Sequence, residues 1–223
     1  MQAYFNKFHV NLFTILLIST NFDKNAYMTI LNKEKLILAS KSPRRKALLE
    51  QASVTFDIII SSIDEDNIVE EDPVKLVSAL SRLKADDIAQ KNPGRWVLGA
   101  DTIVCLEKSI LGKPDSQDHA GQMLRSLSNR EHKVHTGITL LCREKNKIIT
   151  EVVTTDVLFK KLSEKEIAWY INTKEYTDKA GAYAIQGKSS FFIKKIKGSY
   201  TNVVGLPLCE VMSHLISENI IKF

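Results

Sequence analysis

The sequence predicts an α/β fold with a mixed sheet flanked by helices. Apolar runs of strand length alternate with segments in which apolar residues recur every three to four positions, the spacing of an amphipathic helix. The two patterns stay interleaved along the chain, which is the order typical of α/β proteins. The chain has 223 residues, of which 44% are hydrophobic, and this is enough to build the core of one domain.

The first strand is expected at residues 36–40, and a helix follows it directly. Ser42 suits the N-cap and Pro43 the first helical position, and the helix continues to residue 52. The apolar stretch at 54–62 predicts the next strand.

An acidic loop at 63–72 leads into a long helix that begins at Asp72-Pro73 and ends near Gln90. One side of this helix is expected to face the core through Val77, Leu80, Leu83 and Ile88. Lys84 lies on the same apolar stripe, four residues from both Leu80 and Ile88.

Beyond the Asn-Pro-Gly turn at 92–94, the pattern predicts a strongly apolar strand at 96–106, a turn at 111–115 and a helix near 116–127. Ser163 and Glu166 form a capping box for a later helix. The remaining expected elements are paired strands at 132–142 and 148–160, a helix at 164–171, a small-residue loop at 178–190, a strand and turn at 191–200, and a helix at 203–220.

Composition narrows the class of protein. The net charge of +5 is scattered, with no dense basic arm or aromatic-basic RNA motif, so nucleic acid is not an expected partner. Three widely spaced cysteines, Cys105, Cys142 and Cys209, give no zinc or disulfide pattern and predict buried free thiols in a reducing cytoplasm.

Residues 1–31 form an N-terminal extension, and residues 32–223 form the single expected domain. The apolar run at 10–18 is too short to cross a bilayer as a helix, and no A-x-A-like cleavage site follows it, so no membrane partner is expected. Met28 is the alternative start that we favour.

Arg44 and Arg45 stand at the start of the first helix, where the backbone dipole disfavours positive charge. A helix N-terminus binds anions, and guanidinium groups pair with phosphate oxygens, so a phosphate bound there would explain both arginines. A solvated surface pair is the alternative, and the pattern alone leaves both readings open.

Asp101 is the second candidate, because apolar residues surround it in the strand at 96–106. A carboxylate there must be paired, bind a metal or have a shifted pKa. The structural alternative is a buried aspartate that only bonds neighbouring backbone N–H groups. Gly99 and Ala100 are expected to leave room for a ligand beside it. The acidic residues Asp64, Glu65 and Asp66 could supply oxygen ligands to a hard cation, or simply be solvated.

Other side chains carry weaker signals. Lys84 lies on an apolar stripe, and the simpler interpretation is that its aliphatic stem packs there while its ammonium group reaches water. Lys113 lies on a turn, where a solvated side chain is the simpler interpretation. His132 and His135 fall on opposite faces of a strand and are not expected to share a metal. No glycine-rich dinucleotide or P-loop motif is present.

Four colinear motifs resemble the Maf family of nucleoside triphosphate pyrophosphatases, the septum formation protein family. They are "LILASKSPRRKALLE", "VLGADTIVCLEKSILGKP", "DKAGAYAIQG" and "SYTNVVGLPL", and the resemblance runs from about Leu36 to Leu215. It implies an elongated fold like that of inosine triphosphate pyrophosphatases, with two lobes around a cleft, often dimeric. It also implies cleavage of a nucleoside triphosphate to monophosphate and pyrophosphate, with Mg²⁺ or Mn²⁺ as cofactor, and a role in cleaning nucleotide pools linked to cell division arrest.

The resemblance also assigns site residues. It implies Asp101 as the proton acceptor, Glu65 and Asp101 as metal ligands, and a phosphate-binding set made of Ser40, Arg44, Arg45, Lys84 and Lys113. The dTTP/UTP branch of the family is similar to this chain at Arg44, Thr102 and Gln186, which become the expected specificity residues.

Lys41 and Ala184 stand where the family commonly has glycine, and neither change removes a reactive group. Two rival functions remain: a pyrophosphatase of the same fold acting on 7-methyl-GTP or deaminated purines, and a non-catalytic division regulator or nucleic-acid-binding protein.

Overall fold

The computed structural model describes residues 30–65 and 68–223. The expectations for the apolar run at 10–18, Met28 and Asp66 lie outside these residues. No helix in the described ranges has both the length and the apolar character to cross a membrane.

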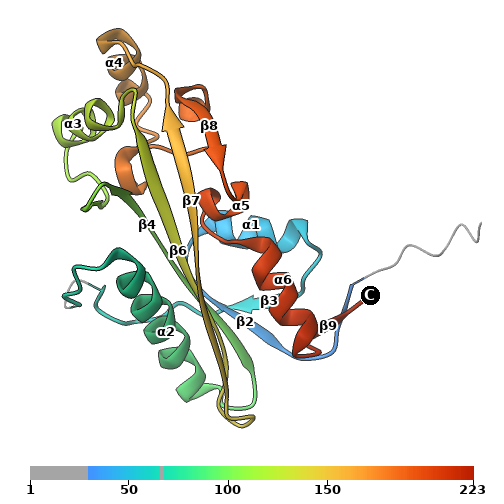
Figure 1. Cartoon of the computed structure of the whole chain (residues 1–223). Coiled ribbons are helices and arrows are strands. Elements are labelled where there is room, and N and C mark those ends of the chain that lie inside the picture. Colours follow the sequence, from blue (N-terminus) through green and yellow to red (C-terminus); the bar gives the residue numbers. More distant parts are fainter. Residues whose placement is uncertain (1–29, 66–67) are drawn as a thin grey trace, which may run out of the picture.

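The main sheet has seven strands and is mixed, as the sequence predicts (Figure 1). Its order is β3-β2-β4-β6-β7-β8, with β5 paired to β4; the β3-β2-β4 part is parallel and the other pairings are antiparallel. The strands are β2 (Leu36–Ala39), β3 (Phe56–Ile58), β4 (Trp96–Leu106), β5 (Ser109–Leu111), β6 (Glu131–Cys142), β7 (Lys147–Phe159) and β8 (Ile193–Lys197). A separate antiparallel pair joins β1 (Leu31–Asn32) to β9 (Ile221–Lys222).

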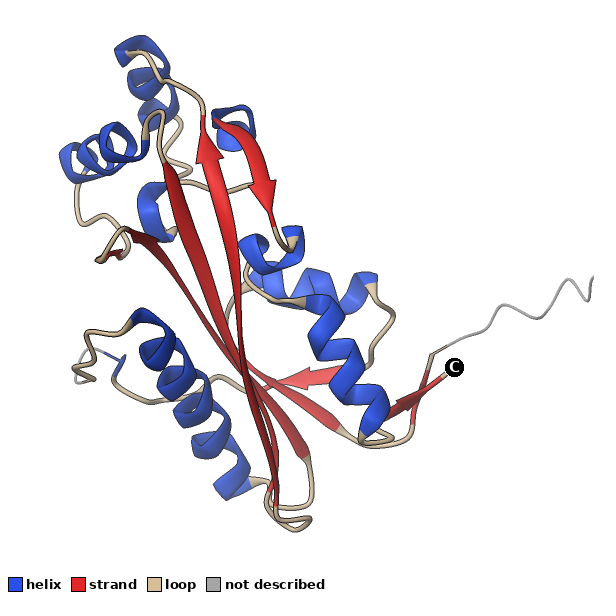
Figure 2. Cartoon of the chain, viewed as in Figure 1, coloured by secondary structure: helices blue, strands red, loops and turns tan. Residues whose placement is uncertain are grey.

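Helices cover the long sheet in two regions (Figure 2). In one half, α2 lies on one face while α1, α5 and α6 lie on the other; α3 and α4 gather at the far end with two short 3-10 helices. The bounds are α1 (Pro43–Gln51), α2 (Pro73–Lys91), α3 (Gln117–Leu127), α4 (Glu164–Asn172), η2 (Ala180–Ala182), η3 (Lys188–Phe192), α5 (Tyr200–Val204) and α6 (Leu208–Ser217).

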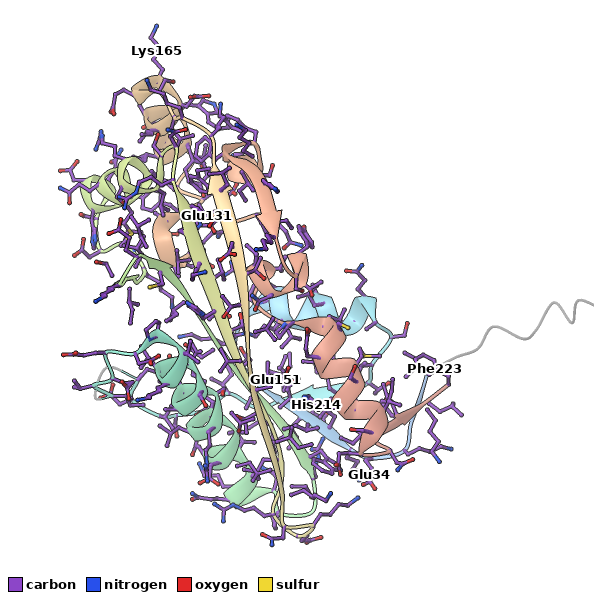
Figure 3. The ribbon with its side chains drawn as sticks, viewed as in Figure 1. Glu34, Glu131, Glu151, Lys165, His214 and Phe223 are labelled. Atoms are coloured by element: carbon purple, nitrogen blue, oxygen red, sulfur yellow. The ribbon has the colours of Figure 1, made fainter. Side chains whose placement is uncertain are left out.

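Three apolar clusters form the core in the described part of the chain, and one of them lies between α2 and the sheet. Leu36, Trp96 and Leu215 belong to the core beneath α1 and α6, whereas Phe159 and Tyr170 belong to the core at the far end. Where α6 meets β7, His214 and Glu151 lie side by side, with 2.7 Å between Nε2 and Oε2 (Figure 3).

Several sequence-based expectations are wrong in detail. The strand expected at 54–62 spans only Phe56–Ile58, because the chain then leaves the sheet toward α2. The helix expected at 203–220 is two helices, since Gly205 has a positive φ of 125° and Pro207 starts the second helix. Leu83 is 42% exposed, so it does not belong to the buried stripe of α2, and Cys209 is exposed although the other two cysteines are buried.

The close packing of α2 on the sheet depends on two glycines. A Cβ atom on Gly99 would lie 2.2 Å from the carbonyl oxygen of Ser81, and one on Gly137 would lie 2.2 Å from that of Val77. The space beside Gly99, which we expected a ligand to use, is therefore filled by the backbone of α2. The two glycines bring Lys84 close enough to the sheet to reach Asp101.

Strand β4 has a gap in its hydrogen-bonded edge, and this gap positions the site. Pairing with β2 ends at Gly99, and pairing with β5 begins only at Val104. The intervening residues, 100–103, face the connection between β2 and α1. The carboxyl end of the parallel strand β2 lies at this gap, and ligand sites in open α/β sheets are found at the carboxyl ends of parallel strands.

Candidate active site

A cavity of about 970 Å³ opens beside the unpaired edge of β4. Its walls come from the β2–α1 connection, the acidic loop, the middle of β4 and the segments around residues 112, 183 and 204. All nine sequence-predicted site residues line this one cavity: Ser40, Arg44, Arg45, Glu65, Lys84, Asp101, Thr102, Lys113 and Gln186.

Lys84 joins two carboxylates that are far apart in the sequence. Its Nζ donates to Asp101 Oδ1 at 2.7 Å and to Glu65 Oε2 at 2.8 Å. The side chains of Lys84 and Asp101 are only 10% and 12% exposed, whereas that of Glu65 is 48% exposed. The apolar stripe on which Lys84 lies thus directs a buried ammonium to the carboxylate of β4. Within the described ranges, Asp101 Oδ2 has no hydrogen-bond partner, so it is the oxygen that can accept a proton.

The acidic loop is held to α2 at its base. Asp87 Oδ2 accepts from the Ser62 backbone N–H at 2.8 Å and from the Ser61 hydroxyl at 3.0 Å. The Ser62 bond is the main cause that lowers the pKa of Asp87. Ser62 lies three residues before Glu65, so these bonds to Asp87 fix the start of the segment that carries Glu65.

Arg45 is buried and bonds chiefly to the protein. Its Nε donates to the Gly205 carbonyl at 2.8 Å, and one terminal nitrogen donates to Ser40 Oγ and to the Ala100 carbonyl, both at 2.9 Å. The other terminal nitrogen donates to Thr102 Oγ1 at 3.0 Å. Four of the five N–H groups of a guanidinium are therefore used. Burial lowers the pKa of Arg45, and the charge of Asp101 opposes that shift.

These contacts show what Arg45 does in the fold. Ala100 pairs with β6 on one edge of β4 but has no neighbouring strand on the other edge, and a buried carbonyl without a donor is costly. Arg45 supplies that donor and at the same time ties β2, β4 and the end of α5 together. Its expected role as a phosphate ligand stays a prediction.

Other cations remain at the cavity wall. Arg44 lies 3.4 Å from Asp178 Oδ2, and its side chain is 29% exposed. Lys41 and Lys113 are exposed and have no ion-pair partner within the described residues. The Ser42 side chain makes no capping bond to α1, although Ser42 occupies the predicted N-cap. Three positive side chains, those of Lys41, Arg44 and Lys113, thus line the cavity.

The expected specificity residues reach the cavity from different elements. Thr102 points to the face opposite Asp101, as alternation along a strand requires, and lies 3.0 Å from Thr136 Oγ1. Gln186 is exposed on the loop that precedes η3. Thr102 bonds to Arg45, Arg44 pairs with Asp178, and all three expected specificity residues line the same cavity.

The two histidines of the H-x-x-H sequence do not meet. His132 is buried and bonds through Nε2 to the Tyr183 hydroxyl at 2.7 Å, whereas His135 bonds to Thr154. Desolvation lowers the pKa of His132 to about 4. The described ranges hold no group of three His, Cys, Asp or Glu side chains suited to a metal. The carboxylates of Asp101 and Glu65 are instead a donor pair that suits Mg²⁺, which takes one or two carboxylates and completes its shell with phosphate and water.

Sequence reasoning missed three supporting groups. Asp178 and Gly205 lie inside motifs quoted above, but nothing in the spacing shows that one faces Arg44 and the other accepts from Arg45. Asp87 is one of two neighbouring aspartates on α2, and only the fold places the serines over it.

The chain is similar in sequence to proteins that are already known. Residues 35–218 match the family described as Maf-like protein. The "dTTP/UTP pyrophosphatase" of Syntrophus aciditrophicus is 50% identical over 82% of this chain and 89% of its own length. The protein of the same name from Geotalea uraniireducens is 48% identical over 82% of this chain and 94% of its own length. The solved Staphylococcus aureus Ham1 protein aligns with a TM-score of 0.45 and 13% identity, covering 83% of this chain and 100% of that one. With the family match over most of its length and relatives near half identical, the chain belongs to the Maf-like protein family.

Proposed function

We propose that this protein is a nucleoside triphosphate pyrophosphatase that converts dTTP and UTP, with related pyrimidine nucleotides, to the monophosphate and pyrophosphate. The observation that carries the proposal is the placement of Lys84 between Asp101 and Glu65 at a cavity lined by Arg44 and Gln186. The names of the relatives support the same substrates.

The reaction needs a base, and Asp101 is the residue in position to act as one. A water molecule beside Oδ2 gives its proton to the carboxylate as its oxygen attacks the α-phosphorus. The bond from that phosphorus to the bridging oxygen breaks, and pyrophosphate leaves with the electron pair. Lys84 fixes the orientation of the carboxylate through Oδ1.

Charge on the phosphate chain requires cations at the cavity wall. Arg44 and Lys113 can reach the β and γ phosphates, with Ser40 and the start of α1 offering hydrogen bonds. Arg45 holds Ser40 and Thr102 in place and has one N–H left for an oxygen of the substrate.

A divalent cation, Mg²⁺ or Mn²⁺, would be held by Asp101 and Glu65 together with phosphate oxygens. When bound, it would neutralise charge on the phosphates and polarise the phosphorus under attack. Glu65 lies on an exposed loop, so its carboxylate can turn from Lys84 toward a cation.

The nucleobase of the substrate would be recognised by the part of the cavity wall that includes Gln186, whose amide can both donate and accept hydrogen bonds.

We expect the protein to work in the cytoplasm, where the free thiols of Cys105 and Cys142 stay reduced. We also expect it to form a homodimer, which light scattering on the purified protein would measure.

The test is pyrophosphate release from a nucleotide panel with Mg²⁺ and with Mn²⁺. Faster release from UTP and dTTP than from 7-methyl-GTP and deaminated purine triphosphates would support the proposal. Faster release from the purines would place the protein in the rival enzyme class. No release from any nucleotide, together with salt-sensitive DNA binding, would favour the nucleic-acid-binding regulator.

A further inference from the structure

Gln186 lies on a loop whose backbone is tied from both sides. Residues 184–189, here termed the Gln186 loop, run from the buried Tyr183 into the first two residues of the 3-10 helix η3. Gln186 itself is exposed and lines the cavity. An exposed side chain can select a base only if the backbone beneath it is fixed.

Ser189 closes this loop through a single hydroxyl. Its Oγ accepts from the Ala184 N–H at 2.9 Å and donates to the Ala184 carbonyl at 2.8 Å. The side chain is 0% exposed, so water does not replace either bond. The two ends of the loop are therefore held together on the protein side, away from the cavity.

Glu175 holds the same loop from the neighbouring segment. Its carboxylate oxygens accept from the Lys188 N–H at 3.0 and 3.3 Å. Gly187 has a φ of +96°, and a Cβ atom on it would lie 2.3 Å from Glu175 Oε1. The residue after Gln186 must be glycine for the carboxylate to approach this closely.

The geometry points to Ser189 and Glu175 as positioning residues that set base specificity by fixing the Gln186 loop. This inference rests on the proposed function, in which Gln186 contacts the pyrimidine. Neither residue lines the cavity, so both act through Gln186. Uracil and cytosine differ in the donor and acceptor pattern of one edge, and a mobile amide discriminates less well between them than a fixed one.

The experiment compares Ser189→Ala and Glu175→Ala with the wild type in kcat/KM for UTP and for CTP. We expect each variant to lower the UTP/CTP ratio about fivefold, since a discriminating hydrogen bond is weakened but not removed. Glu175→Gln keeps an acceptor for the Lys188 N–H and should restore most of the ratio. The matched control is Ser190→Ala, at an exposed serine one residue away, which should leave the ratio unchanged.

Two further measurements separate positioning from general damage. Inhibition by inorganic tripolyphosphate reports on the phosphate side of the cavity, and its inhibition constant should stay within about twofold, because no phosphate contact changes. In a Gln186→Ala background, Ser189→Ala should cause no further loss of the ratio.

The inference is overturned if Ser189→Ala and Glu175→Ala slow UTP and CTP hydrolysis equally, or if the ratio still falls in the Gln186→Ala background. If Ser189→Ala does not fold, the Glu175→Ala and Glu175→Gln pair decides. If the wild type hydrolyses no nucleotide, both the proposed function and this inference are wrong. If the wild type is active and the variants keep its UTP/CTP ratio of kcat/KM, only this inference is wrong.

Discussion

The Nζ of Lys84 lies 2.7 Å from Oδ1 of Asp101, and both side chains are almost fully buried. This pair joins the long helix α2 to the middle of β4. Asp101 lines the cavity, and its second carboxylate oxygen makes no hydrogen bond within the described residues, so it is free to accept one from a water molecule.

Replacing Asp101 with asparagine should remove the base and leave the fold intact. The amide oxygen can still accept from Lys84, but the side chain cannot take a proton. We expect kcat for UTP to fall about 100- to 10,000-fold while the melting temperature changes little. Pyrophosphate release and thermal melting measure the two quantities. Asp57→Asn, at an exposed carboxylate that pairs with Arg95, is the matched control and should retain full activity. Near-normal activity in Asp101→Asn would contradict the base assignment.

Replacing Lys84 with methionine should cost stability as well as activity. The variant leaves the buried Asp101 carboxylate without its cation, and loss of one partner of a buried pair costs about 3 kcal/mol. Urea unfolding would measure the loss, and the double variant with Asp101→Asn should recover part of it. Lys46→Met, at a surface pair with Glu50, should change the free energy of unfolding by less than about 1 kcal/mol. Equal losses in the two lysine variants would rule out a buried pair.

Arg45→Lys keeps the positive charge but cannot reach four acceptors spread over three elements. We expect the free energy of unfolding to fall by about 3 kcal/mol, since buried carbonyls at Ala100 and Gly205 lose a charged donor. Chemical denaturation checks this value. Arg44→Lys, at a partly exposed arginine, serves as the control for stability alone. If Arg45→Lys unfolded at the same denaturant concentration as the wild type, these hydrogen bonds would not contribute to the stability of the fold.

Gly137→Ala should push α2 away from the sheet, because the added methyl would overlap the Val77 carbonyl. Such overpacking costs about 2 kcal/mol and would lengthen the contact between Lys84 and Asp101, so activity should fall too. Gly112→Ala is the control for stability, as nothing lies within 4 Å of the added atom. The idea of close packing fails if Gly137→Ala melts like the wild type.

Acid should destabilise the protein through His132. Burial lowers its pKa from 6.5 to about 4, so the folded protein keeps it neutral while the unfolded chain binds a proton. Its contribution is fully present above pH 6.5 and is lost as the pH falls toward 4, by about 3 kcal/mol in total. Urea unfolding between pH 4 and 7 should show a shallower dependence in His132→Gln than in the wild type. Identical slopes would mean that His132 does not titrate in this way.

Local patterns in the sequence predict the class of fold, the order of most elements and the set of residues that line the cavity. The local signals are the spacing of apolar residues, the capping box at Ser163, and the turns marked by glycine and proline. They predict α2, β4, β6, β7 and α4 near their observed bounds. The position of Lys84 on an apolar stripe and of Asp101 inside an apolar strand marked both as unusual, because burying a charge requires a partner.

The contacts among these residues come from the tertiary fold and could not be predicted from local patterns. Whether the acidic loop reaches Lys84, which carbonyls Arg45 bonds and what fills the space beside Gly99 depend on contacts between segments far apart in the chain. The short strand β3 and the break at Pro207 were misjudged for the same reason: an apolar run becomes a strand or helix only where a neighbour is present to pair or pack with it.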